Sequence, residues 1–270
     1  MSDNLPDQGT GTGRFRPFAE LLVSLQFLSR LPIPFSRTID PVPLSEAMRF
    51  FSIAGALLAL ISPLAFLGLH YLHVPVWVAA AIAVAVGLAI TGALHEDGLA
   101  DSADGLFGGH TREARLEIMR DSRIGTYGAC ALFLALVVRV ALFQNLASLP
   151  AVEFLTVMAA GGAFSRAMVV DLLWASRPAR RDGLSALAGR PSRGTAFFAI
   201  LTGGALVIAV GLQLGRPEAG IIAIAVATAI TGLIRALAGR LLGGQTGDIC
   251  GATQVLTELG ILTAFAAIIG

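Results

Sequence analysis

The chain has 270 residues, of which 55% are hydrophobic and 14% charged, and its mean hydropathy is +0.77. Soluble globular domains carry roughly 25% charged residues, so this composition excludes an ordinary soluble enzyme and indicates an integral membrane protein. The formal net charge of +1 excludes a global field that would attract nucleic acid. All nineteen basic residues are arginine, whose rigid fork of donors suits phosphate groups.

The N-terminal region is predicted to form a tail followed by a helix on the membrane surface. Residues 1–17 are polar and glycine-rich, without the pattern of a signal peptide, and we expect a disordered cytoplasmic tail. Residues 18–31 have helical apolar spacing but are too short to span, and Pro32 and Pro34 end the segment. Residues 18–270 are expected to form a single integral membrane catalytic domain.

The rest of the chain predicts an all-α, polytopic helical membrane protein with about six or seven spans. A bilayer core requires about 20 apolar residues per helix. Segments of this kind are predicted at 50–72, 74–94, 128–149, 151–174, 195–214 and 219–241. A seventh at 253–270 is weakened by its short length and by Glu258.

The links between these spans alternate between tight turns and long polar segments. Fifteen arginines lie in the N-terminal region, in the long links 95–127 and 175–194, or at the border of the link 242–252. The tight turns near residues 73, 150 and 216 hold only Arg216. Arginine accumulates on the cytoplasmic side, so we expect the N-terminus and all three long links to face the cytoplasm.

The most unusual stretch is LHEDGLADSADGLFGG, at residues 94–109. Asp97, Asp101 and Asp104 are spaced i, i+4 and i+7, which places them on one stripe of a helix. Converging carboxylates suit Mg²⁺ or Mn²⁺, and the neighbouring glycines leave room for a large anionic group. The alternative is a solvated cap at the mouth of a membrane helix.

Two glycine-rich segments are candidates for phosphate binding. Gly125 and Gly128 can let backbone amides approach a phosphate next to Arg123, although an ordinary helix-entry turn explains them equally well. The loop 243–252 contains Gly247 and Asp248, and Asp248 can complete a metal site or act as a base. A flexible turn with one capping aspartate is the alternative there.

Ionisable residues inside the spans also need an explanation. For Arg139 a structural role is favoured. For Arg166, substrate contact and pairing with Asp171 are equally good explanations. His95 and His110 flank the acidic stretch and are expected to contact substrate or stabilise helix ends, since a zinc site needs more ligands at close spacing. Together the carboxylates, glycine-rich loops and arginines suggest phosphoryl transfer from a nucleotide-linked donor to an alcohol.

A family resemblance makes this expectation more specific. The acidic stretch, the later segments EIMRDSRIGTYG and GGQTGDICGA, and the early FLSRLPIP resemble the adenosylcobinamide-GDP ribazoletransferase (cobalamin synthase) family, with the motifs in the expected order. The resemblance implies an Mg²⁺-dependent enzyme of the bacterial inner membrane. It would join adenosylcobinamide-GDP to α-ribazole or α-ribazole 5′-phosphate and release GMP.

The resemblance also implies roles for individual residues. The metal-binding acids would be Glu96, Asp97, Asp101 and Asp104, and the last three would be catalytic together with Asp248. Phosphate, nucleotide or other substrate contacts would come from His95, Arg123, Gly125, Arg166, Arg240 and Gly247. The expected partners are the two substrates and the lipid bilayer, no nucleic acid, and, as an open alternative, further copies of the chain.

Two other functions stay open on the sequence alone. CDP-alcohol phosphotransferases of phospholipid synthesis also begin a motif Asp-Gly-x-x-Ala, as at Asp97, but they require arginine where this chain has Asp101. A cation transporter would carry its acids in mid-span and show paired repeats, whereas here the acids cluster at one end of the spans.

Overall fold

The structure is a computed structural model that describes residues 16–32, 42–180 and 183–269. Most of the predicted N-terminal tail lies outside these residues. The described part is all-α, with the single isolated bridge Pro178–Gln245 in place of any sheet. Its helices are α1 (Pro17–Leu28), α2 (Leu44–Ala47), the 3₁₀ helix η1 (Met48–Phe50), α3 (Phe51–Ala59), α4 (Ile61–Tyr71), α5 (Val76–Thr91), α6 (Leu94–Gly108), α7 (Arg112–Ile118), α8 (Thr126–Leu146), α9 (Ala151–Ala175), α10 (Leu184–Leu187), α11 (Arg193–Gln213), α12 (Pro217–Leu242) and α13 (Gly247–Ile269).

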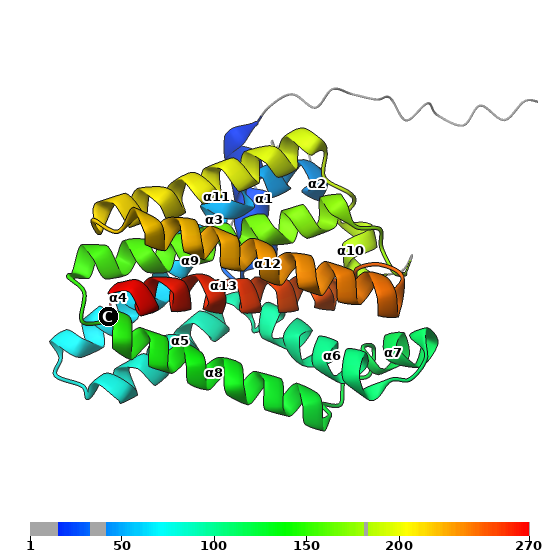
Figure 1. Ribbon diagram of the computed structural model, residues 1–270, viewed down its shortest axis with the longest axis horizontal. Coiled ribbons are helices and arrows are strands. Elements are labelled where there is room, and N and C mark those ends of the chain that lie inside the picture. The colour runs from blue at the N-terminus through cyan, green and yellow to red at the C-terminus, as the bar shows by residue number, and fades with distance from the viewer. Residues whose placement is uncertain (1–15, 33–41, 181–182, 270) are drawn as a thin grey trace, which may run out of the picture.

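The long helices form one bundle whose two ends differ (Figure 1). The tight turns α4–α5, α8–α9 and α11–α12 lie at one end, which we call the turn end. The helices α7 and α10 and the α12–α13 connection lie at the other, which we call the loop end. The predicted alternation of short and long links is therefore confirmed, and the two kinds of link lie at opposite ends of the bundle.

The number of spans agrees with the prediction, although two boundaries differ. Among the described residues, six helical stretches are long and apolar enough to cross a membrane, and α5 with α6 gives a seventh if this bent pair is one span. The stretch Leu44–Tyr71 includes a break near Leu60, because Pro63 has no N–H to bond the carbonyl of Ala59. The segment predicted at 253–270 begins earlier, at Gly247, so only the first half of the glycine-rich segment 243–252 is a loop.

The helix α9 lies at the centre of the bundle, where it packs against α3, α11 and α13. Glycines permit the closest of these contacts: a Cβ on Gly162 would lie 2.6 Å from the carbonyl oxygen of Gly55 in α3. The apolar window of α9 is 83% buried, against 22% for α12. The outer helices therefore present their apolar side chains to lipid, and α9 presents its own to other helices.

The predicted span 74–94 is broken. The helix α5 ends at Thr91, and α6 leaves it at 90° after Gly92 and Ala93, which both have positive φ (65° and 53°). A left-handed alanine is strained by about 1–2 kcal/mol. The backbone N–H of Arg30 donates to the carbonyl of Ile90 at 2.7 Å, which stabilises the end of α5. The break lies near the middle of the bundle (Figure 1), so α6 starts there and runs toward the loop end.

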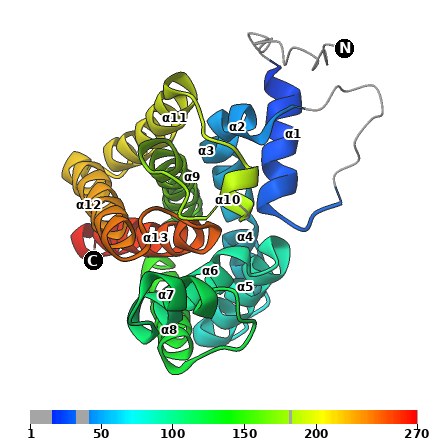
Figure 2. The ribbon, with the colours of Figure 1, turned by 90° about the vertical axis from the view of Figure 1, so that its right-hand side faces the viewer.

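The helix α1 lies across the bundle rather than along it. Figure 2 looks along the long helices from the loop end, and α1 is seen from the side. It packs against α2, η1 and α3. The crosswise orientation agrees with the prediction that this helix does not span, whereas its place at the membrane surface stays a prediction.

Backbone contact between two glycines sets the distance from α6 to α13. A Cβ on Gly98 would lie 2.8 Å from the carbonyl oxygen of Asp248 and 3.1 Å from the Cα of Gly251. A Cβ on Gly251 would lie 3.0 Å from the carbonyl oxygen of His95. The two helices therefore touch through their backbones, and no side chain fits between them.

Replacing Gly98 by alanine is therefore expected to push α6 away from α13. Overpacking of this kind costs about 1–3 kcal/mol, so the thermal unfolding midpoint in detergent should fall. Gly232→Ala in α12 is the matched control, because no atom lies within 4 Å of the added Cβ and alanine is the better helix former. Equal midpoints for the two variants would contradict the close contact.

Candidate active site

The acidic helix α6 is fastened to α8 at two points. At its deep end, Arg139 of α8 donates from Nη1 to Oε1 of Glu96 at 2.6 Å. At the loop end, Asp104 accepts the N–H groups of Gly125 (2.7 Å) and Gly128 (2.9 Å) with its two carboxylate oxygens. These amides belong to the N-terminus of α8, where a carboxylate satisfies free N–H groups and is favoured by the helix dipole.

The predicted phosphate cradle at Gly125 is therefore occupied by the protein's own carboxylate. A Cβ at Gly125 or Gly128 would collide with Asp104, which explains both glycines. Arg123 is 87% exposed and forms a two-pronged ion pair with Asp121, with contacts from 2.6 to 3.0 Å. These bonds lower the pKa of Asp121 to about 2. Arg123 is thus paired with a neighbour at the surface, and its predicted contact with a substrate phosphate stays a prediction.

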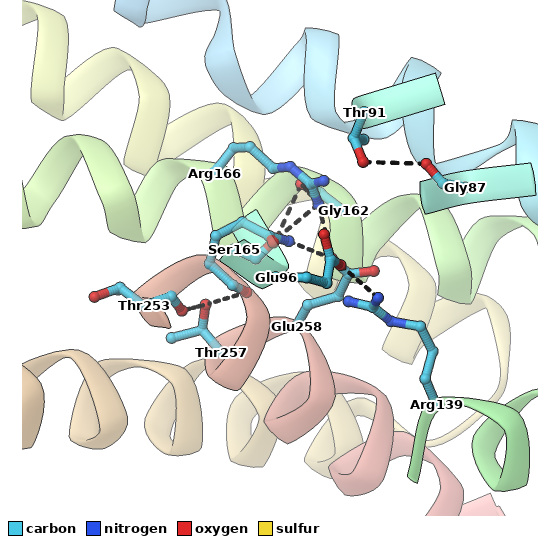
Figure 3. Close-up of polar contacts among 11 residues, drawn as sticks. Gly87, Thr91, Glu96, Arg139, Gly162, Ser165, Arg166, Thr253, Thr257 and Glu258 are labelled. Atoms are coloured by element: carbon cyan, nitrogen blue, oxygen red, sulfur yellow. Dashed lines mark hydrogen bonds and ion pairs between the residues drawn. The ribbon is translucent and has the colours of Figure 1, made fainter. Parts of the chain in front are cut away.

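A second ion pair completes a buried charge network, shown in Figure 3. Arg166 of α9 donates from Nη1 to Oε2 of Glu258 in α13 at 2.9 Å, and to Oγ of Ser165 at 3.2 Å. Gln254 also donates to Glu258. The two pairs Glu96–Arg139 and Arg166–Glu258 line one cavity, and their formal charges cancel. Four helices, α6, α8, α9 and α13, are therefore joined by a neutral quartet inside the bundle.

This network decides three of the sequence predictions. The structural role of Arg139 is confirmed. Arg166 does not pair with Asp171, because Glu258 is its partner and Asp171 instead faces Arg235 at 3.8 Å. Glu258, which weakened the prediction of the last span, is neutralised by Arg166, so α13 can cross an apolar environment.

Two of the remaining carboxylates meet at a second cavity, which α6 and α13 line together with α1, η1, α3, α9 and α10. Asp97 and Asp248 both line it, together with Gly247, Arg166 and His95. Asp101 lies one turn beyond Asp97 and within electrostatic range of Asp97, Asp104 and Asp248. No hydrogen bond or ion pair from the described residues reaches the carboxylate of Asp97 or Asp101. The glycine contact described above therefore brings carboxylates of two helices to one place.

Asp248 is held by groups at the start of α13. The hydroxyl of Thr246 donates to Oδ2 of Asp248 at 3.1 Å and accepts the N–H of Ile249 at 3.3 Å, which caps the helix. Nη2 of Arg180 contacts the same Oδ2 at 3.3 Å. The Nε and Nη1 atoms of Arg180 are buried without a partner among the described residues. Arg180 thus binds Asp248 with one nitrogen, and its other two donors are not used by the described residues.

Arg180 was missed by the sequence reasoning, because it looked like any arginine of a long polar link. Its place depends on pairing between two distant loops. Ala179 donates to the carbonyl of Gln245 at 2.7 Å, and Gln245 donates back to that of Arg177 at 2.8 Å. Arg112 donates from Nε to the carbonyl of Leu242 (2.7 Å) and from Nη2 to that of Ala179 (2.6 Å). No sequence spacing predicts this convergence.

The predicted metal ligands are only partly brought together. The described residues include no group of three or more His, Cys, Asp or Glu side chains placed so that they could hold a metal ion. Glu96 and Asp104 are engaged by Arg139 and by α8, whereas Asp97 and Asp101 are available. Ligation by all four acids stays a prediction.

The other predicted substrate contacts divide in the same way. His95 is buried and lines both cavities, and Gly247 lines the one that Asp97 shares with Asp248. Arg240 is exposed on the last turns of α12, and His110 is exposed after α6; neither lines a described cavity between α6 and α13. Their predicted roles stay untested.

Removing one member of the Glu96–Arg139 pair is expected to destabilise the fold strongly. Glu96→Gln leaves a buried guanidinium uncompensated, which costs about 3–5 kcal/mol. The double variant Glu96→Gln/Arg139→Gln removes both charges and should recover much of that loss. The free energy of unfolding in detergent measures both effects. If the loss in the double variant equals the sum of the losses in the two single variants, a direct pair is contradicted.

Comparison with known proteins gives one consistent result. The model of the family described as cobalamin-5-phosphate synthase matches residues 20–266. An adenosylcobinamide-GDP ribazoletransferase of Azorhizobium caulinodans is 41% identical, over 92% of this chain and 95% of its own length. A relative of the same name from Xanthobacter autotrophicus is 44% identical, over 90% of this chain and 95% of its own length. Another, from Bradyrhizobium diazoefficiens, is 42% identical, over 96% of this chain and 97% of its own length. No solved structure matches. The chain therefore belongs to the adenosylcobinamide-GDP ribazoletransferase family.

Proposed function

We propose that this protein transfers the phosphocobinamide group of adenosylcobinamide-GDP to α-ribazole or α-ribazole 5′-phosphate, and that the transfer takes place between α6 and α13. The observation that carries the location is the cavity that Asp97 and Asp248 share. Family membership supports the pair of substrates over the CDP-linked donors of phospholipid synthesis. The pairing of every charge in the buried quartet argues against a cation pathway through the bundle.

The reaction is a displacement at phosphorus. A hydroxyl oxygen of the ribazole attacks the phosphorus attached to cobinamide, and the bond from that phosphorus to the oxygen bridging to GMP breaks. GMP leaves with the electron pair of that bond, and the hydroxyl proton passes to a carboxylate. Asp248 is the candidate to accept it, because its carboxylate lines the cavity. Arg180 has donors available for the charge on the phosphates.

We further propose that the reaction depends on Mg²⁺. The residues fit the usual mode of Mg²⁺ binding, in which one or two carboxylates hold the ion and substrate phosphates complete its shell. Asp97 and Asp101 would hold it, since no described residue pairs with either. When bound, the ion neutralises charge on the reacting phosphates.

The loop end is proposed to face the cytoplasm of a bacterial inner membrane. The excess of arginine in the long links supports this orientation, and these links lie together at the loop end (Figure 1). The nucleotide-linked donor would then reach Asp97 and Asp101 from the aqueous side.

The test uses the full chain, purified and reconstituted in liposomes, with adenosylcobinamide-GDP and α-ribazole 5′-phosphate. GMP and corrinoid product should form together with Mg²⁺, stop with EDTA and resume when Mg²⁺ is restored. No product from a folded protein would contradict the function, whereas product formed equally well with EDTA would contradict the metal alone. CDP-alcohol donors and cation flux in sealed vesicles would then test the two alternatives.

The matching variants test the residues. Asp97→Asn and Asp101→Asn should each lower GMP release by at least about 100-fold, the scale of a lost catalytic group. Glu218→Gln makes the same chemical change at the turn end, where Glu218 pairs only loosely with Arg216 at 3.8 Å, and it should leave the rate unchanged. Full activity in Asp97→Asn would remove Asp97 from the site.

A further inference from the structure

The cavity that Asp97 shares with Asp248 has two chemically different walls. One is apolar and comes from α1, η1, α3 and α9, with Phe27, Met48, Phe51 and Leu173 among its residues. The other carries Asp97, Asp248 and Arg166. The cavity measures about 110 Å³ and opens at its mouth, so it encloses part of a small molecule rather than a whole one, since small-molecule sites typically measure roughly 300–1,000 Å³. Its two walls suit an amphipathic molecule that extends out through the mouth.

The apolar wall is aromatic where α1 crosses the bundle. The rings of Phe27 and Phe51 lie 5.8 Å apart and nearly parallel, at 18°. Phe51 is buried in the core, whereas Phe27 stays 37% exposed. A flat aromatic group that packs on this wall buries apolar surface and gains favourable ring contacts.

The polar wall holds donors that lack partners. Oγ of Ser185 and Nε of Arg166 are both buried, and no described residue bonds to them. Buried polar atoms are costly when they are left unpaired, so both positions call for an external partner. The hydroxyl and ring oxygens of a ribose supply the acceptors that these donors need.

We propose that this cavity binds the acceptor nucleoside, with the benzimidazole base of the ribazole on the Phe27–Phe51 wall and its ribose toward Ser185, Arg166 and the two carboxylates. The assignment rests on the proposed function and places a ribose hydroxyl beside Asp97 and Asp248. The donor, a corrin macrocycle joined to a nucleoside diphosphate, is far larger than this cavity. Its phosphates reach the carboxylates from the loop end while the macrocycle stays outside.

The guanosine of the donor is the competing occupant, since it is also an aromatic nucleoside. A guanine base carries a polar edge with donors and acceptors that require partners. The wall formed by Phe27, Leu28, Met48, Phe51 and Leu94 offers none from its side chains. The benzimidazole base carries a single acceptor, its free ring nitrogen, so burial there leaves one polar atom of the base to be paired, against several on guanine.

Steady-state kinetics of the reconstituted chain separate the two occupants. Phe27→Ala and Ser185→Ala should each raise the KM for α-ribazole at least fivefold, with the KM for adenosylcobinamide-GDP and kcat within twofold of the parent. Neither substitution is expected to destabilise the fold much, because Phe27 is part-exposed and the Ser185 hydroxyl has no described partner. Phe133→Ala is the control, since this phenylalanine of α8 is 67% exposed and lies outside the cavity.

Binding without turnover provides the second readout. The fluorescence of α-ribazole should report saturable binding to the parent protein and weaker binding to Phe27→Ala, and GMP should not displace it. Displacement by GMP, or a rise in the donor KM in place of the acceptor KM, would overturn the assignment and place guanosine in the cavity. These results are distinct from failure of the proposed function, in which the parent chain releases no GMP from the two substrates.

Discussion

The arrangement of this site depends on the way α6 is attached to α8. An amphipathic helix that carries four carboxylates, and that starts in the middle of an apolar bundle, has little hydrophobic reason to stay there. Glu96 is held by a buried guanidinium, and Asp104 is held by the open N-terminus of α8. These two attachments pair the charges of Glu96 and Asp104, which would otherwise oppose the insertion of α6 into the apolar bundle. They leave Asp97 and Asp101 without partners from the described residues, and α13 adds Asp248.

Much of this could be predicted from the sequence, because its signals are local. Apolar length predicted the spans, and the distribution of arginine predicted that the long links would gather at one end. The break between α5 and α6 was not predicted, because Gly92 looks like any other glycine in a membrane helix and Ala93 is an excellent helix former. The 90° turn from α5 into α6 requires the left-handed alanine, and the packing of α6 against α13 holds α6 in that direction.

The partners of the charges could be predicted far less well. Asp97, Asp101 and Asp104 share a stripe, but their spacing does not say which of them meets α8 and which faces α13. Arg166 had an aspartate five residues away, yet its partner Glu258 lies 92 residues away. Helix periodicity defines a face of a helix, whereas the neighbour of that face depends on the packing of the whole bundle. Arg180 shows the same limit, since its position follows from loop pairing between residues 178 and 245.

The glycine contact between α6 and α13 has a consequence for how such a site can change over evolution. Because backbone meets backbone at Gly98 and Gly251, the separation of Asp97 from Asp248 does not depend on the size of any side chain. The wall that comes from α1 and α3 is built from side chains and can be altered without moving these helices. In the proposed arrangement, chemistry and substrate preference reside in separate parts of the cavity, so the preferred base can change by substitutions in the wall while Asp97 and Asp248 keep their separation.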